Sequence, residues 1–263
     1  MSTATWCKAG RTLAPSADTR IQLCGQLLVT WGGERCEAAL PGRQGRLLFA
    51  HLVVHRTSAV TRDALVEALW SADAPRAADT ALAALLSKLR RLVGPDHLVG
   101  RTEVRLVLPD DAQVDLEIAR ATIHSAESAL SAGDWPRAWV ASQTAMFIAR
   151  RGFLSGEDAE WVDDCRREVD ALHLRAVEAY GRSCLGVGGA EHAAAVRAGR
   201  DLVRYAPLRE SGYRLLIEAL DASGNRAEAL LAYEALRLRL RDDLGISPGA
   251  ELRDLHARLL HSG

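Results

Sequence analysis

The sequence predicts a mainly α-helical protein with a small β component: a winged helix-turn-helix domain, then an all-α domain of tetratricopeptide-like helix pairs. Alanine, leucine and arginine dominate the composition and aromatic residues make up only 5% of it, which favours helices. Short strand-like segments occur in the first 113 residues, and strand signals are missing after them. Glycines punctuate the second half at intervals typical of helix pairs.

The chain of 263 residues is long enough for two domains with separate cores. We expect a flexible tail over residues 1–19, a winged-helix domain over 20–112 and a tetratricopeptide-like domain over 113–263. Residues 1–113 contain 14 Lys and Arg against 11 Asp and Glu, a net charge of +3. The remaining residues contain 19 against 23, a net charge of −4. The basic first part is compatible with nucleic-acid binding, and the acidic second part is not suited to it.

Cysteine usage and hydropathy indicate a cytoplasmic protein. The five cysteines are odd in number, widely spaced and without a C-x-x-C pair, a pattern that favours reduced thiols. The N-terminal segment contains no apolar core of a signal peptide, and no stretch approaches 18 uninterrupted apolar residues. We therefore expect neither a signal peptide nor a membrane span.

The first domain is predicted to contain strands, three helices and a final hairpin, in that order. Gly32-Gly33 separates two strand-like segments as a hairpin turn does. The Pro41-Gly42 break precedes a helical stripe, and Thr61 is a good N-cap for "RDALVEALW". A loop then leads to the helix "TALAALLSKLRRLVG", which Gly94 ends. The segment "HLVGRTEVRLVL" follows as two short strands around a tight connection.

The third helix, from Thr80 to Val93, has one apolar and one cationic side. At 100° per residue, its buried stripe consists of Leu82, Leu85, Leu86, Leu89 and Val93. The opposite side carries Thr80, Ala84, Ser87 and Arg91, flanked by Lys88 and Arg90. Small side chains permit close approach to DNA, and cations meet phosphates or guanine edges. A solvated face with cations that serve the helix dipole is the alternative, but the helix-turn-helix order followed by a wing favours a recognition helix.

Seven helices are predicted after residue 113. They are expected near 115–131, 134–150, 157–185, 190–205, 208–222, 225–244 and 249–261. Gly189 and Gly224 each open an alanine-rich helix and stand 35 residues apart, close to the 34-residue tetratricopeptide period. Helix pairs of this kind bury their apolar faces by stacking on each other.

Three stretches of the sequence together resemble one family of bacterial regulators. "LPGRQGRLLFAHLVVHRTSAVTRDALVEALW" and "LSKLRRLVGPDHLVGR" are similar to the OmpR-type winged helix of the SARP family, the actinobacterial antibiotic regulatory proteins. "PLRESGYRLLIEALDASGNRAEALLAYEALRLRLRDDLGISPGAELRDLHARLL" resembles the end of their bacterial transcriptional activator domain. The resemblance spans about residues 20–261. It implies activation of transcription at promoter direct repeats, contact with RNA polymerase, a homodimer on those repeats and control of a biosynthetic gene cluster.

The residues expected to contact double-stranded promoter DNA fall into three groups. Arg43, Gln44 and Arg62 would hold phosphate, and Arg101 and Arg105 would serve the wing. Ser87, Lys88 and Arg91 would face the groove together with Thr80, with Arg90 directed to the DNA backbone. Departures from the family are Ala83 and Ala84 on the recognition helix and a wing turn "RTEVRL", with Glu103 at its tip and Val104 in place of an aromatic residue.

No arrangement typical of an enzyme, metal centre or cofactor site emerges. "GISPG" matches a nucleophile motif only in letters, because a helix precedes it; Gly245 is expected to end that helix, with Ser247 as N-cap and Pro248 as first residue of the next. His51 and His55 lack a third metal ligand and are expected to be a surface or half-buried pair. Trp135, Trp139 and Trp161 are expected to pack in the repeat domain. A ligand-sensing or protein-interaction scaffold with weak DNA binding is the alternative function, and a small-molecule effector stays open.

Overall fold

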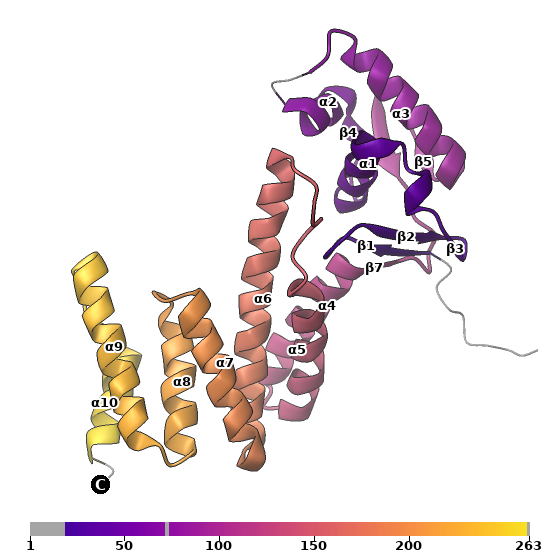
Figure 1. Ribbon diagram of the computed structural model, residues 1–263. Coiled ribbons are helices and arrows are strands. Elements are labelled where there is room, and N and C mark those ends of the chain that lie inside the picture. The colour runs from indigo at the N-terminus through magenta and orange to yellow at the C-terminus, as the bar shows by residue number, and fades with distance from the viewer. Residues whose placement is uncertain (1–18, 72–73, 262–263) are drawn as a thin grey trace, which may run out of the picture. The chain divides into compact units, whose positions relative to one another are not determined.

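The computed structural model describes residues 19–71 and 74–261 (Figure 1), so the expected tail over residues 1–19 lies outside the described part except for Thr19, which is buried. The chain forms two compact units. The first contains the residues up to Gln22 together with Leu27–Val114, and the second contains Leu23–Gln26 together with the residues from Asp115 onward. The mainly α-helical class with a small β component is confirmed.

The first unit begins with a small sheet in the order β3-β2-β1-β7. Its strands are β1 (Arg20–Gln22), β2 (Leu28–Trp31), β3 (Glu34–Arg35) and β7 (Gln113–Val114). β1 and β2 are antiparallel, as are β2 and β3, whereas β7 runs parallel to β1. Gly32 and Gly33 form the β2–β3 turn with φ of +58° and +83°, and two positive φ angles are what a tight hairpin turn requires. The predicted hairpin is confirmed.

Three helices and a second sheet complete this unit. The helices are α1 (Gly42–Val54), α2 (Arg62–Trp70) and α3 (Ala78–Val93). The sheet has the order β4-β6-β5, with β4 (Val60–Thr61), β5 (Leu98–Val99) and β6 (Glu103–Leu106). Leucines from all three helices are fully buried, among them Leu48, Leu65 and Leu86. Thr61 caps α2 as predicted, because its hydroxyl accepts a hydrogen bond from the Ala64 amide at 3.3 Å.

The second unit is a stack of helices that follow one another in space, as Figure 1 shows for α6 to α9. The helices are α4 (Asp115–Ser131), α5 (Trp135–Ala149), α6 (Glu160–Val187), α7 (His192–Tyr205), α8 (Glu210–Ala222), α9 (Arg226–Leu244) and α10 (Ala250–His261). α4 also contacts α6, and α6 also contacts α8, so these three helices lie along one side of the stack. The predicted helices are confirmed, with ends that differ by a few residues. No helix of the described chain is long and apolar enough to cross a membrane.

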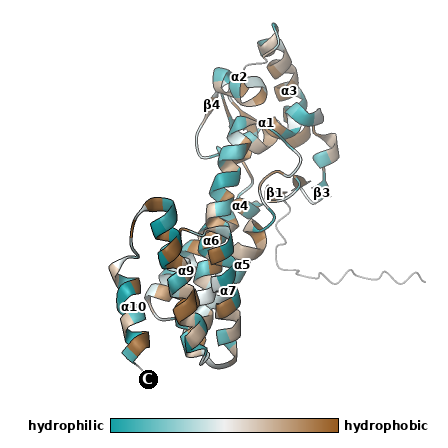
Figure 2. Cartoon of the chain, turned by 60° about the vertical axis from the view of Figure 1, so that its left-hand side comes forward, coloured by the Kyte–Doolittle hydropathy of each residue, from teal (hydrophilic) through white to brown (hydrophobic). Residues whose placement is uncertain are grey.

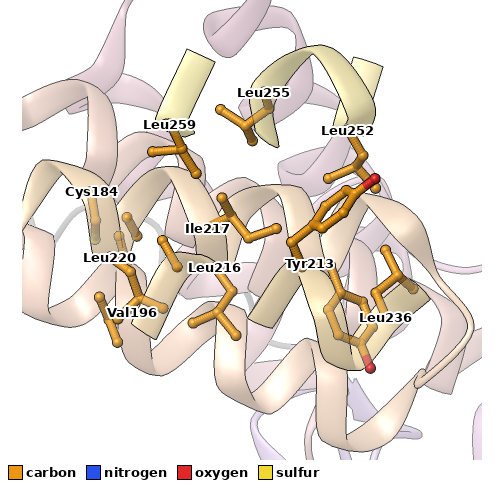
Figure 3. Close-up of a cluster of buried hydrophobic side chains, with 14 of the residues drawn as sticks. Cys184, Val196, Tyr213, Leu216, Ile217, Leu220, Leu236, Leu252, Leu255 and Leu259 are labelled. Carbon is orange, nitrogen blue, oxygen red and sulfur yellow. The ribbon is translucent and has the colours of Figure 1, made fainter. Parts of the chain in front are cut away.

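α8 lies at the centre of the larger core of this unit. Its Tyr213, Leu216, Ile217 and Leu220 form one core with Leu252, Leu255 and Leu259 of α10 and with Val196 and Leu236 (Figure 3). Figure 2 shows hydrophobic and hydrophilic stretches alternating along α9 and α10, as expected of helices with one buried side. At Gly199 an added Cβ would lie 2.7 Å from the Leu216 Cα. Glycine therefore sets the close approach of α7 to α8.

The "GISPG" segment has a structural role that is partly as predicted. Gly245 ends α9 in the left-handed conformation with φ of +68°. The expectation that Pro248 starts the next helix is wrong, because α10 begins at Ala250. The Gly249 carbonyl accepts the first helical hydrogen bond, from the Arg253 amide at 3.2 Å, and the Gly249 amide donates to the Glu210 carboxylate at 2.8 Å. Gly249, and not Ser247 as expected, therefore occupies the N-cap position of α10.

The segment between β1 and β2, Leu23–Gln26, belongs to the second unit. It forms backbone hydrogen bonds with the segment after α5: the Leu154 amide donates to the Leu23 carbonyl at 2.9 Å, and the Gly25 amide donates to the Gly152 carbonyl at 2.9 Å. The Asp115 carboxylate accepts from the amides of Leu23 at 2.8 Å and Cys24 at 3.1 Å. Burial raises the pKa of Asp115, and these amides oppose that rise. Residues 23–26 therefore belong structurally with helices that follow them by some ninety residues.

Candidate nucleic-acid interface

α3 presents the two sides that the 100° periodicity predicts. Leu82, Leu86, Leu89 and Val93 are buried, and Leu85 is half-buried. Thr80, Ala84, Ser87, Lys88 and Arg91 are exposed, as is the neighbouring Ala83. The core of the first unit thus fixes which side of α3 meets solvent, and that side carries small or cationic residues.

Lys88 and Arg91 are the cations on this exposed side. Within residues 19–71 and 74–261, neither forms an ion pair with a carboxylate; the nearest polar partner of Arg91 is the Ser87 hydroxyl at 3.5 Å. Cations without a carboxylate partner in the protein are available to pair with an external anion. The exposed alanines beside them leave room for a close surface. This row can therefore meet a phosphate or a base edge.

Arg90 is turned toward the wing instead. Its Nε donates to the Leu98 carbonyl at 3.2 Å, and its Nη2 donates to the Gly100 carbonyl at 2.6 Å. A guanidinium that makes two such bonds ties the end of α3 to the β5–β6 hairpin. The structure thus gives Arg90 an intramolecular role that sequence reasoning missed.

Two of the expected phosphate ligands also have partners inside the first unit. Gln44 donates from Nε2 to the Leu69 carbonyl, near the end of α2, at 3.3 Å. Arg62 donates to the Asp79 carbonyl at 3.1 Å, and its Nε lies 3.8 Å from the Asp79 carboxylate. These bonds join α1 to α2 and α2 to α3. Arg43, at the start of α1, is exposed, whereas Gln44 and Arg62 are half-buried.

The wing is the hairpin of β5 and β6, and its turn consists of Gly100, Arg101 and Thr102. Arg101 and Arg105 are exposed. The expected turn "RTEVRL" is wrong in register: Glu103 is the first residue of β6 and pairs with Thr61, and Val104 is fully buried rather than at the tip. Strand alternation explains this, because Glu103 and Arg105 face out while Val104 faces the core.

A hollow of about 710 Å³ lies between the start of α2, the start of α3 and the wing. Arg62 and Arg101 line it together with the carboxylates of Asp63, Asp79 and Glu103. Three carboxylates against two guanidinium groups make it unfavourable for a phosphate. DNA that meets the wing would pass beside this acidic group.

One histidine of the pair is more buried than predicted. His51 is 8% exposed, whereas His55 is exposed, and the two rings lie 4.4 Å apart. The described ranges hold no group of three His, Cys, Asp or Glu side chains placed to bind a metal.

Comparison with known proteins assigns this chain to a family. The model of the bacterial transcriptional activator domain matches residues 114–260. This chain belongs to the SARP family of transcriptional regulators. The SARP chain is 29% identical to the regulatory protein AfsR of Streptomyces griseus over 92% of its own length, and 31% identical to the transcriptional regulator RedD of Streptomyces coelicolor over 82%.

A solved structure is also similar. The SARP chain matches Mycobacterium tuberculosis EmbR, in a complex with a low-affinity phosphopeptide, with a TM-score of 0.80 and 28% identity over 92% of this chain and 65% of that one. The SARP chain spans 24% of the S. griseus AfsR protein and 63% of RedD. The relatives therefore contain further sequence that this chain does not match.

Proposed function

We propose that this chain is a sequence-specific DNA-binding activator of transcription. The exposed side of α3 supports this best, because it combines small residues with two cations that pair with no carboxylate among the described residues, next to a wing that exposes Arg101 and Arg105. The first unit would bind promoter repeats, with two copies of the chain on a pair of direct repeats. The acidic second part, net −4 over residues 114–263, would contact RNA polymerase rather than phosphate. Membership of the SARP family, the antibiotic regulatory proteins, supports control of a biosynthetic gene cluster.

In this proposal the DNA-contacting residues divide by their accessibility. Ser87, Lys88 and Arg91 face the major groove, with Thr80 at the entry of the helix. Arg101 and Arg105 contact the backbone beside the wing, and Arg43 contacts phosphate near the start of α1. Gln44, Arg62 and Arg90 act mainly by positioning α1, α2, α3 and the wing through their intramolecular bonds.

Arg91→Ala should weaken DNA binding without changing helix content, because Arg91 lies opposite the buried stripe. A lost guanine contact corresponds to about 1–3 kcal/mol of affinity, and a lost phosphate contact reduces the slope of log affinity against log salt by about one. The measurement is fluorescence anisotropy of the full chain on a duplex selected by it from a random library, and on a random duplex.

Arg137→Ala is the matched control, since Arg137 is an exposed arginine of the second unit. In vitro transcription from a promoter that carries the selected duplex then tests activation by the unaltered chain, Arg91→Ala and Arg137→Ala. If Arg91→Ala and the control bind DNA with equal affinity and equal salt slope, α3 is not the recognition helix.

Glu103→Gln should strengthen DNA binding modestly and with little dependence on sequence. The exposed carboxylate lies in β6 beside Asp63 and Asp79, where its charge repels phosphate. Glutamine keeps the shape of the side chain and the strand. The readout is affinity for a random duplex at about 50 mM salt, where electrostatic binding is strong. Glu160→Gln, an exposed site in α6, serves as control, and an unchanged affinity in both variants would mean that DNA does not approach this part of the wing.

The second candidate function is a scaffold for protein or ligand binding with little DNA affinity. The carboxylates around the wing hollow favour it. If the full chain shifts neither duplex at about 50 mM salt, this alternative replaces the proposed activator.

A further inference from the structure

The second unit contains a hollow of about 720 Å³ that the proposed DNA-binding function does not use. It is lined by α4, α6 and α8, by the first residue of α5, and by Arg209, which immediately precedes α8. A volume of this size suits a small organic molecule. All of its lining residues belong to the second unit.

Trp135 gives the hollow an aromatic wall. The prediction that Trp135 is a packing residue holds for only part of its ring: the residue is 36% exposed, and it lines the hollow. A Cβ at Gly186 would lie 2.3 Å from the indole Cδ2 and 2.7 Å from Cε2 and Cε3. The backbone of α6 therefore supports the ring directly at its centre, which holds it in place and leaves the remaining surface for stacking. Leu130 and Leu185 add apolar surface beside it.

Two arginines at the hollow share a single carboxylate. Arg182 lies 3.2 Å and Arg209 lies 2.9 Å from the Glu178 carboxylate, which also accepts from the Ser211 hydroxyl at 3.0 Å. The Glu178 side chain is 14% exposed, whereas those of Arg182 and Arg209 are 40% and 37% exposed. The negative charge is therefore deeper than the two positive charges, and this cluster presents a net charge of +1 to the hollow.

The other charged side chains that line the hollow also form ion pairs. Arg175 forms a two-bond pair with Glu127, at 2.8 and 2.7 Å. Glu218 is paired at 2.9 Å with Arg214, which does not line the hollow and also pairs with Glu251. The lining as a whole is therefore neutral, and Arg182 and Arg209, which share one carboxylate, are the guanidinium groups with donors left for an anion on the same hollow as the indole.

We propose that this hollow binds a small planar aromatic acid, with its ring on Trp135 and its acidic group on Arg182 and Arg209. One supported ring and two guanidinium groups that share a single carboxylate match a single ring system with a single anionic group. The proposed contacts come from the start of α5, from α6 and from the residue before α8, so an occupant bridges these elements. Its binding stabilises the folded second unit by an amount that rises with the logarithm of its concentration once that exceeds Kd.

The test uses two probes of the same shape, 2-naphthoate and the neutral 2-naphthamide, with the full chain. Calorimetry should show saturable binding of 2-naphthoate, and binding of 2-naphthamide about tenfold weaker, since the lost charge-assisted contact is of that size. Equal binding of the two probes, or no saturable binding of 2-naphthoate at about 1 mM, where fragment affinities are measurable, overturns the proposal.

Variants locate the probe. Arg182→Gln should reduce binding of 2-naphthoate about tenfold and leave that of 2-naphthamide unchanged; Glu178 keeps Arg209 as partner, so this variant should fold. Trp135→Leu should reduce binding of both probes. Arg197→Gln, at an exposed position of α7, should change neither. Binding of 2-naphthoate that survives Arg182→Gln at full strength lies elsewhere and refutes the assignment, whether or not Trp135→Leu folds.

Discussion

Gly100→Ala is expected to destabilise the first unit by about 3 kcal/mol, the sum of an unfavourable backbone conformation and a steric clash. Gly100 has φ of +90°, which side chains with a Cβ rarely adopt. An added Cβ would lie 1.8 Å from the Glu103 carbonyl oxygen, an atom of the backbone that no side-chain rotation can move away. The hairpin turn of the wing must therefore open.

The damage should extend to the link between wing and recognition helix. The Gly100 carbonyl accepts from Arg90, and the Thr102 carbonyl accepts from the Arg62 amide at 3.3 Å. Both bonds depend on the path of this turn. We therefore expect DNA affinity to fall more in Gly100→Ala than a change of the wing surface alone would cause.

Gly33→Ala provides the matched control. Gly33 also has a positive φ, +83°, but an added Cβ there meets nothing within 4 Å, so only the conformational cost of about 1 kcal/mol remains. Urea unfolding followed by hydrogen exchange of the α1 and α3 peptides reports on the first unit. If both alanines cost the same, the Gly100 turn is not as tight as its geometry indicates.

The helices and the outward side of α3 could be predicted because their signals are local. Periodic leucines and the glycines between them define the helices of the second unit, and the same periodicity separates Leu86 from Arg91 on α3. The register of the wing is also visible in the local sequence, because the polar Glu103 and Arg105 alternate with the apolar Val104 and Leu106. The predicted turn lay too far toward the C-terminus. These features need no knowledge of distant residues.

The remaining features depend on residues far apart in the chain. β7 pairs with β1 across about ninety residues, and Leu23–Gln26 group with the second unit although their neighbours do not. A fragment of residues 20–112 would leave the buried Leu23 and Cys24 without these partners. The bonds of Arg90, Arg62 and Gln44 likewise arise from tertiary packing, so composition and spacing suggested only their charge or polarity.

Acidification from pH 7 to pH 4 should cost the first unit about 3 kcal/mol through one residue, His51. Burial, and secondarily the charge of His55 beside it, lowers the pKa of His51 from 6.5 to about 4. Between pH 6.5 and about pH 4, His51 therefore binds a proton in the unfolded chain but stays neutral in the folded chain. The stability contribution of neutral His51 is complete above pH 6.5 and falls by about 1.4 kcal/mol per pH unit until pH 4, which gives about 2 kcal/mol at pH 5.

The variant His51→Leu isolates this effect from that of carboxylates that titrate in the same range. Leucine is apolar and of similar size, so α1 can keep its packing, while the proton-binding difference disappears. The free energy of unfolding of the first unit, from urea titrations with exchange of the α1 peptide, should then decline between pH 7 and pH 5 by about 2 kcal/mol less than in the unaltered chain. His124→Leu, at an exposed position of α4, should retain the full decline. A parallel decline in all three proteins would show that His51 is protonated in the folded state, which its burial opposes.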